Sequence, residues 1–286
     1  MPDLASVNGV ITPSREAKIS AWDRGFIFGD GVYDVIHIYN GKAYRLKAHI
    51  ERLYRSAEAI ELDKIMPPEE KIEKDCVDLI NKSGLFQAQL YIQVTRGVAP
   101  RDPAFPKNTP PTVFIAVEEF IPMPAEKREK GVKVIAVPDY RWRRNDIKSL
   151  NLIPKVLNHE LAVREGAYEG IYVSEGGYVT EATGCNVFIV EKGEICTVPL
   201  SGNILTGVTR GDIIELADEL GIKVNECEIT LERLISADEV FLSGTLTEIL
   251  GVVKVDENVI ADGRVGNVTN RLYKAYHRLI ERETGG

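Results

Sequence analysis

The chain is poor in the residues from which disulfide frameworks and metal sites are built. It contains only four cysteines and four histidines among 286 residues. No two cysteines have CxxC spacing, and no two histidines have the spacing of a metal-ligand pair. A disulfide-stabilised secreted domain and a metal site are therefore not expected, and reduced cysteines favour an intracellular, cytoplasmic protein.

Long apolar segments and an excess of basic charge are also missing. No uninterrupted apolar stretch approaches the roughly 20 residues that cross a bilayer, and the N-terminus lacks a basic start followed by an apolar run. The formal net charge is -8, which argues against a surface for nucleic acid or for anionic membranes. An acidic chain can still hold a local basic pocket for a small anion.

The residues that are present predict two α+β domains. Runs of β-forming residues flank Asn40-Gly41, a pair typical of a tight hairpin. Periodicity and end signals predict helices over residues 47–62, 67–84, 154–165, 209–221 and 268–283, and strands over 88–97, 111–119, 132–138 and 237–245, with several more within 169–198. Strands and helices do not alternate strictly, which argues against a doubly wound sheet. A proline-rich, charged segment predicts a linker at 119–125 between an N-terminal domain, 1–118, and a C-terminal domain, 126–286.

The chain has neither of the familiar glycine-rich phosphate loops, GxGxxG after a strand or GxxxxGK[ST]. Three other features could bind an anion. Thr206–Arg210 opens a predicted helix, whose free amides and dipole attract anions, although Thr206 could simply cap the helix. Ser243-Gly244-Thr245 could form a nest of backbone amides or a plain turn. Arg52 lies on a predicted helix, where a lone arginine is usually a surface charge.

Two lysines, Lys148 and Lys155, lie seven residues apart, a spacing that would place them on one face of a helix. Pro154 disfavours a continuous helix through both, so Lys155 is interpreted as a solvated charge at the start of a helix, and Lys148 lies on the connection before it. Glu181 precedes a run of small residues, Ala182–Cys185, which would let a flat ligand approach the backbone. The alternative for Glu181 is an ordinary turn carboxylate.

An ordered set of motifs carries a family resemblance. DRGFIFGDGVYDV, HIERLYRSA, VTRGVAPR, DIKSLNL, VTEATGCNVF, ILTGVTR and SGTLTEI follow one another between about Trp22 and Asn270. This set resembles the class IV, or fold type IV, pyridoxal-phosphate aminotransferases, which include D-amino-acid and branched-chain aminotransferases and have aminodeoxychorismate lyase as a relative. The resemblance implies a two-domain α+β fold with pyridoxal 5'-phosphate between the domains, in a homodimer.

The resemblance also implies the cofactor residues. Lys148 aligns with the Schiff-base lysine, which later acts as a base on the substrate Cα–H and needs a lowered pKa, to which Arg141, Arg143 or Arg144 could contribute. Glu181 aligns with the carboxylate that pairs with the pyridine nitrogen and keeps the ring an electron sink. The remaining cofactor residues implied are Arg52, Thr209 and Thr245 for the phosphate with the amides of Val208 and Gly244, Leu205 on the ring face, and Asn186 as support.

The substrate residues implied come from two subfamilies. Tyr33 and Arg101 match the tyrosine and arginine that hold the substrate carboxylate in D-amino-acid aminotransferases, but Pro103 stands where a histidine is expected. Core packing and a loop charge are the alternatives for Tyr33 and Arg101. SGTLTEI, which contains Leu246, resembles the carboxylate-binding turn of branched-chain enzymes, although Gln93 replaces the arginine of their Tyr-x-Arg-Pro pattern.

The expected function is therefore transamination of a D-amino acid of the D-alanine or D-glutamate type with a 2-oxo acid such as 2-oxoglutarate. The alternatives are a branched-chain L-amino-acid aminotransferase, then an (R)-amine transaminase or aminodeoxychorismate lyase. A non-catalytic protein that binds a phosphorylated metabolite is an alternative of another class, and it would tolerate Lys148→Arg.

Overall fold

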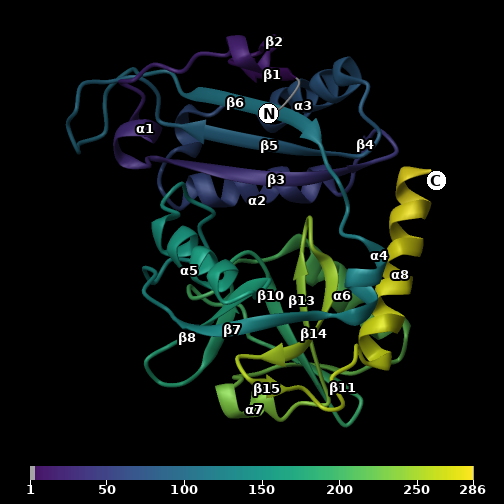
Figure 1. Cartoon of the computed structure of the whole chain (residues 1–286). Helices are drawn as coiled ribbons and strands as arrows, with labels where there is room; N and C mark the ends of the chain where they lie inside the picture. The colour runs from purple at the N-terminus through teal and green to yellow at the C-terminus, as the bar shows by residue number, and fades with distance from the viewer. Residues whose placement is uncertain (1–3, 286) are drawn as a thin grey trace. The chain divides into compact units, whose positions relative to one another are not determined.

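The computed structural model, which describes residues 4–285, contains two sheets that belong to two separate units (Figure 1). Unit 1 contains the chain up to Ile121, the segment Ile147–Asn151 and the C-terminal residues from Ile280. Unit 2 contains Pro122–Asp146 and Leu152–Leu279. The unit boundaries therefore place Lys148 in unit 1, whereas the predicted boundary places it in the C-terminal domain.

Unit 1 is built on an antiparallel sheet. Within residues 4–285 its strands are β1 (Leu4–Val7), β2 (Val10–Pro13), β3 (Gly31–Tyr39), β4 (Lys42–Ala43), β5 (Ala88–Thr95) and β6 (Thr112–Glu119), in the order β2-β1-β6-β5-β3-β4. The predicted hairpin joins β3 to β4, and Asn40 and Gly41 have φ of 51° and 74°, as a primed turn requires.

One face of this sheet packs against α2 (Leu46–Glu58) and α3 (Glu69–Ser83), which form a core with alternate residues of the strands. The strand residues Val32, Ile36, Leu90 and Ile92 are fully buried in this core. Since side chains alternate along a strand, Tyr33 and Gln93 lie on the opposite face. The short α1 (Arg24–Phe28), η1 (Ser14–Glu16) and η2 (Asp63–Ile65) complete the helices of the unit.

Unit 2 is built on a mixed sheet. Its strands among the described residues are β7 (Val132–Pro138), β8 (Glu169–Val173), β9 (Val179–Ala182), β10 (Asn186–Glu191), β11 (Glu194–Thr197), β12 (Val224–Glu226), β13 (Glu239–Gly244), β14 (Glu248–Val255) and β15 (Asn258–Val259). The order is β12-β11-β10-β13-β14-β7-β8-β9, with β15 on β14. The pairs β7–β8, β7–β14 and β11–β12 are parallel and the others antiparallel.

The helices of the second part of the chain are α4 (Ala125–Lys130), α5 (Ile153–Arg164), α6 (Val208–Glu219), α7 (Leu231–Ile235) and α8 (Asn267–Thr284). The predicted α+β class is confirmed, as are the predicted long helices. The helix α5 begins only at Ile153 with Pro154 in its first turn, so Lys148 and Lys155 do not share a helix. Within residues 4–285 no helix is both long and apolar enough to cross a bilayer.

Candidate active site

Lys148 is held by its backbone against the start of β3. Its carbonyl accepts from the Tyr33 amide at 3.0 Å, and its amide donates to Ser56 Oγ at 3.1 Å. On either side, Ser149 forms a bridge with Val32, and buried Ile147 packs into the core of unit 1. The side chain extends over the Tyr33 ring, with Nζ 4.6 Å from the ring centroid. The backbone of Lys148 is therefore fixed by a strand-like pairing and by an apolar anchor.

Arg52 is buried, so the surface-charge interpretation of this residue is wrong. Its Nε and Nη2 donate to the two carboxylate oxygens of Asp34 at 2.9 and 2.7 Å, and His49 Nδ1 lies 2.8 Å from the same carboxylate. Burial raises the pKa of Asp34, but Arg52 and His49 outweigh it and hold that pKa well below its ordinary value. The ionised Asp34 thus fixes the direction of the Arg52 guanidinium.

Tyr33 lies on the face of the sheet opposite the helices, so it does not belong to the helix-packed core. It is buried, directly opposite Gln93 in the β3–β5 register, and stacked on Tyr91 with ring centroids 5.8 Å apart. The Tyr91 hydroxyl donates to Gln93 Oε1 at 2.7 Å, and burial raises the pKa of Tyr91 to about 12. This face therefore presents a neutral, hydrogen-bonded set of side chains beside Lys148.

Arg101 lies in the long exposed loop between β5 and β6. Its guanidinium carbon is 5.5 Å from the centroid of the Phe28 ring. Pro103 contributes its carbonyl oxygen, which accepts from Arg24 Nη2 at 3.2 Å. The loop thus combines an exposed cation with backbone that is tied to buried structure.

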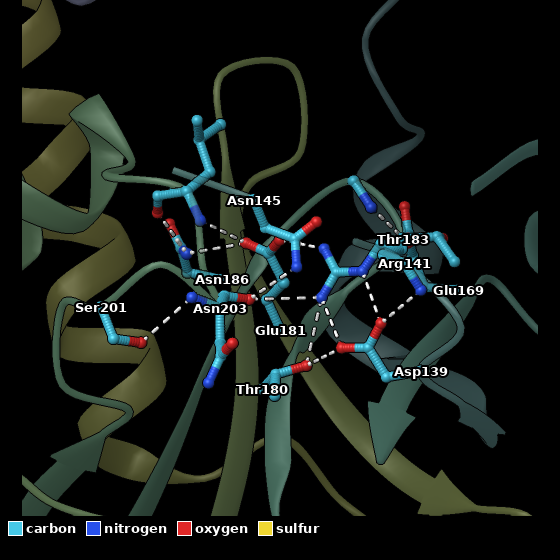
Figure 2. A network of polar contacts seen from close by, with 12 residues as sticks. Asp139, Arg141, Asn145, Glu169, Thr180, Glu181, Thr183, Asn186, Ser201 and Asn203 are labelled. Carbon is cyan, nitrogen blue, oxygen red and sulfur yellow. Dashed lines mark hydrogen bonds and ion pairs between the residues drawn. The ribbon is translucent and has the colours of Figure 1, made fainter. Parts of the chain in front are cut away.

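Glu181, at the end of β9 in unit 2, is buried at the centre of a polar network (Figure 2). One oxygen is hydrogen-bonded to Arg141, and the other accepts from the Leu205 amide at 3.0 Å. Arg141 also forms a bidentate pair with Asp139, at 2.9 and 2.8 Å, and its guanidinium carbon lies 3.9 Å from the Tyr172 ring centroid.

The charges of this network stabilise one another. Burial lowers the pKa of Arg141, but its hydrogen bonds and the two carboxylates raise it well above its ordinary value. Burial raises the pKa of Asp139, but the bonds from Arg141 and Thr180 bring it below its usual range. Arg141 therefore remains a cation beside Glu181. Arg144, another arginine considered for the lysine pKa, is paired with Asp146.

Asn186 ties Glu181 to the segment before α6. Its Nδ2 donates to the Leu205 carbonyl at 3.0 Å and lies 3.5 Å from the Glu181 carboxylate. Gly207 packs so closely on this amide that a Cβ there would come within 2.1 Å of Asn186 Oδ1. Asn186 thus fixes the backbone of Leu205.

The two predicted anion segments of unit 2 lie near this network. Gly207, not Thr206, caps α6 and makes no side-chain cap bond, so the alternative of a Thr206 cap is wrong, and Val208 and Thr209 open the helix. Ser243 is the cross-strand partner of Asn186, and a Cβ on Gly244 would lie 3.1 Å from Cys185 Sγ. Buried Ser243 Oγ has no hydrogen-bond partner among the described residues.

These groups fit pyridoxal 5'-phosphate chemically. A helix N-terminus with Thr209, the turn with Thr245 and an unsatisfied buried hydroxyl suit a phosphate. A buried carboxylate suits a pyridinium nitrogen, and a fixed primary amine suits an aldehyde. Unit 2 contains Glu181, Asn186, Leu205, Val208, Thr209, Gly244, Thr245 and Leu246, and it joins the first three by hydrogen bonds. Unit 1 contains Lys148, Tyr33 and Arg52; Lys148 lies over the Tyr33 ring, and the charges of Lys148 and Arg52 both act on His49.

Sequence reasoning missed the partners that orient these groups. Asp34, His49, Asp139 and Thr180 have no local pattern that marks them, since their partners lie on other strands and helices. Arg141 stands in a run of arginines, RWRR, where only burial separates it from its exposed neighbours.

Comparison with known proteins adds independent information. The family model described as amino-transferase class IV matches residues 31–255. The D-alanine aminotransferase of Staphylococcus epidermidis is 41% identical over 277 residues, 96% of this chain and 97% of that protein. The D-alanine aminotransferase of Bacillus licheniformis is 37% identical and covers 97% of each chain.

Among solved structures, branched-chain amino acid aminotransferases share the fold. The T.th. enzyme, solved with pyridoxamine 5'-phosphate, has a TM-score of 0.91 at 29% identity and covers 100% of this chain and 95% of its own. The enzyme of Escherichia coli has a TM-score of 0.91 at 30% identity, over 98% of this chain and 95% of that chain.

Proposed function

The chain belongs to the class IV aminotransferases, which depend on pyridoxal 5'-phosphate, and from that premise we propose that it transaminates D-amino acids of the D-alanine or D-glutamate type with a 2-oxo acid such as 2-oxoglutarate. The observation that carries this choice is the 41% identity to a D-alanine aminotransferase across 96% of the chain. Tyr33 and Arg101, which match the carboxylate-binding pair of D-amino-acid enzymes, support it.

The proposed roles follow from the chemistry of each group. Bound pyridoxal phosphate supplies an aldehyde for the amine and an electron-poor ring that stabilises negative charge at the substrate Cα. Lys148 Nζ is the primary amine that would hold the cofactor through its aldehyde, and the same amine, when free, would serve as the base for the substrate Cα proton. The backbone pairing of Lys148 with β3 supports this role, because a fixed base needs little reorganisation.

Glu181 is the carboxylate that would pair with the ring nitrogen of the cofactor. Arg141 and the Leu205 amide orient the carboxylate, because both donate to it. The Leu205 side chain would pack on the ring, and Asn186 holds the Leu205 backbone. Arg52, Thr209 and Thr245, with the amides of Val208 and Gly244, would bind the phosphate.

The substrate carboxylate is assigned to Tyr33 and Arg101, with the turn at Leu246 lining the pocket. Pro103 supplies no side-chain donor, so Arg101 is the cation of the pair. A branched-chain L-amino-acid aminotransferase remains the second candidate, because the solved structures that resemble this fold at a TM-score of 0.91 are branched-chain enzymes.

We also propose that the enzyme is a cytoplasmic homodimer. Its four cysteines are free thiols, three of them buried, which suits a reducing compartment. The helix α5 exposes Ile153, Val156, Leu157, Leu161 and Val163, an apolar surface of the kind that subunit contacts cover.

Spectroscopy of the purified protein with pyridoxal phosphate tests the reaction. Wild type is expected to be yellow, to fix its colour covalently on borohydride reduction and to bleach fastest with D-alanine or D-glutamate. The comparison substrates are L-leucine and (R)-1-phenylethylamine. Faster bleaching by L-leucine would overturn the D-amino-acid assignment in favour of the branched-chain candidate.

Lysine variants test the role of Lys148. Lys148→Ala is expected to lose the covalent bond and at least about 100-fold in turnover, because the base is gone. The matched control is Lys155→Ala, on α5, which should remain yellow and active. If Lys148→Arg retains the physiological function, the binding-protein alternative replaces the enzyme.

A further inference from the structure

We propose that Arg24 is a positioning residue that latches the substrate-binding loop, and that the latch sets the affinity for substrates bearing an α-carboxylate. This inference rests on the proposed role of Arg101. It concerns unit 1 alone, where Arg24 opens the short helix α1 and is only 3% exposed.

One guanidinium binds three consecutive carbonyl oxygens of the loop. Arg24 Nη1 donates to the carbonyls of Asp102 and Ala104, the latter at 3.2 Å, and Nη2 donates to that of Pro103 at 3.2 Å. These three residues follow Arg101 directly in the sequence. The latch therefore acts on the backbone that presents the Arg101 side chain.

A partly buried carboxylate, that of Asp30, fixes Arg24 in turn. Asp30 accepts from Arg24 Nε at 2.7 Å and from Arg96 Nε at 2.9 Å. Arg96 donates to the carbonyls of Ile60 and Glu61 at 2.6 and 3.1 Å. Two guanidiniums thus share one carboxylate, and five carbonyl oxygens accept from their Nη groups. Because such a network is costly to leave half-satisfied, it holds one arrangement.

The aromatic rings around the loop reinforce the same geometry. Arg24 and Arg101 lie 4.8 and 5.5 Å from the centroid of the Phe28 ring, and Arg96 lies 3.7 Å from that of Phe105. At the base of the loop, Gly97 has φ of 83°, and a Cβ there would come within 2.0 Å of the Pro110 carbonyl oxygen. The loop is therefore anchored at its base and on both sides of Arg101.

The start of the loop is paired with the segment before α1 through the Asp23–Val98 bridge, but the part after Arg101 lacks such pairing. No strand or helix lies between Thr95 and Thr112, a range that the structure describes throughout, and residues 101–105 are exposed. Pro103 has no amide hydrogen, and its side chain offers no donor for a carboxylate. The exposed guanidinium of Arg101 must then supply the positive charge that binds the substrate carboxylate. Displacing such a group by about 1 Å can lower the reaction rate on the order of 100-fold. The latch supplies the fixed position that Arg101 needs.

The test compares two donors in half-reactions of the holoenzyme: D-alanine, which has an α-carboxylate, and D-alaninamide, which does not. Arg24→Met is expected to raise KM for D-alanine by about tenfold or more while kcat changes less than about threefold. KM for D-alaninamide should stay within about twofold. Equal changes for the two donors would refute the proposal, since a general folding defect affects both.

Limited trypsin digestion gives a readout that needs no activity. Release of the loop should accelerate cleavage of the Arg101–Asp102 bond in Arg24→Met by about tenfold, because proteases cut backbone that is free to move. The matched control is Arg15→Met, whose side chain is 80% exposed and which should behave as wild type in both assays. An unchanged cleavage rate in Arg24→Met would overturn the latch.

Two further variants, Arg24→Lys and Arg101→Met, distinguish a folding defect from loss of the proposed roles. Arg24→Lys retains the charge but cannot donate to Asp30 and three carbonyls together, so it should show the same selective effect if Arg24→Met fails to fold. In an Arg101→Met background, Arg24→Lys should add nothing to KM for D-alanine. If Arg101→Met alone leaves KM for D-alanine unchanged, the proposed role of Arg101 is wrong. The digestion of Arg24→Met still shows whether Arg24 holds the loop in place.

Discussion

His49 is kept neutral within a group of charges. Burial lowers its pKa, and the charges of Arg52 and Lys148 lower it further, while Asp34 opposes them by charge and hydrogen bond without overcoming burial. Asp34 lies on β3, Arg52 on the same helix as His49, and Lys148 on the segment beside β3. In the folded protein the imidazole therefore binds its proton more weakly than in the unfolded chain.

This arrangement predicts that stability falls as pH decreases through about 6.5, the ordinary histidine value. Below it the unfolded chain takes up a proton that folded His49 does not, so protons favour unfolding, with a slope of up to about 1.4 kcal/mol per pH unit. Urea unfolding between pH 7.5 and 5 measures the slope. His49→Gln should flatten it, whereas His159→Gln, on exposed α5, should not. Equal slopes for wild type and His49→Gln would contradict the assignment.

Among single residues, the sequence marks the groups proposed to react more clearly than it marks the groups that orient them. Lys148 and Glu181 stand in motifs whose order is informative, and both are in ordered, hydrogen-bonded positions. Asp34 and Arg141 orient other side chains through hydrogen bonds to residues that are distant in the sequence. The identity of one residue does not show whether its side chain is buried, so Arg52 could be interpreted as a surface charge although it is buried.

Among the elements, the turn between β13 and β14 is supported from two helices. Arg128, in α4, donates to the carbonyls of Thr247 and Ile249 at 3.1 and 2.7 Å and lies 3.3 Å from the Glu248 carboxylate. His277, in α8, lies 3.0 Å from the same carboxylate. Glu248 has φ of 59°, a strained conformation for a residue with a side chain, which persists only where neighbours enforce it.

Arg128→Met should therefore loosen the turn that carries Gly244 and Thr245. The loss of a partly buried charged donor should cost about 1–3 kcal/mol in stability. We expect Kd for pyridoxal phosphate to rise by about tenfold, because the turn proposed to bind the phosphate is less ordered before binding. Thermal unfolding and a fluorescence titration with the cofactor measure the two effects. Arg164→Met, on exposed α5, is the control. An unchanged Kd would show that Arg128 only stabilises the fold.

Elements with periodic sequence were predictable, and elements defined by distant pairing were not. The helix α3 has a buried stripe of Ile72, Cys76, Leu79 and Ile80 and ends at Gly84, all visible in the sequence. The pairing of Lys148 with the start of β3 joins positions more than 100 residues apart through one bridge. A single bridge leaves no repeating pattern, so the sequence showed Lys148 only as part of a connection.

At the scale of the whole molecule, α5 exposes large apolar side chains that the fold of one chain leaves uncovered. It buries only Asn158 and Ala162, whereas Leu157 is 64% exposed and Leu161 42% exposed. These two leucines lie four residues apart and so face the same side of the helix. A monomer that exposes such a stripe would be prone to nonspecific association, and a second copy of the chain could cover it.

Leu157→Glu combined with Leu161→Glu should therefore shift the protein from the proposed dimer toward the 31.8 kDa monomer, because two carboxylates in an apolar contact remain unpaired. Light scattering coupled to size exclusion measures the mass across a range of concentrations. Val77→Glu, on the exposed face of α3, is the matched control and should remain dimeric. A double variant that stays dimeric would place the subunit contact elsewhere. Because circular dichroism of a folded monomer should match that of wild type, loss of the dimer can be separated from loss of the fold.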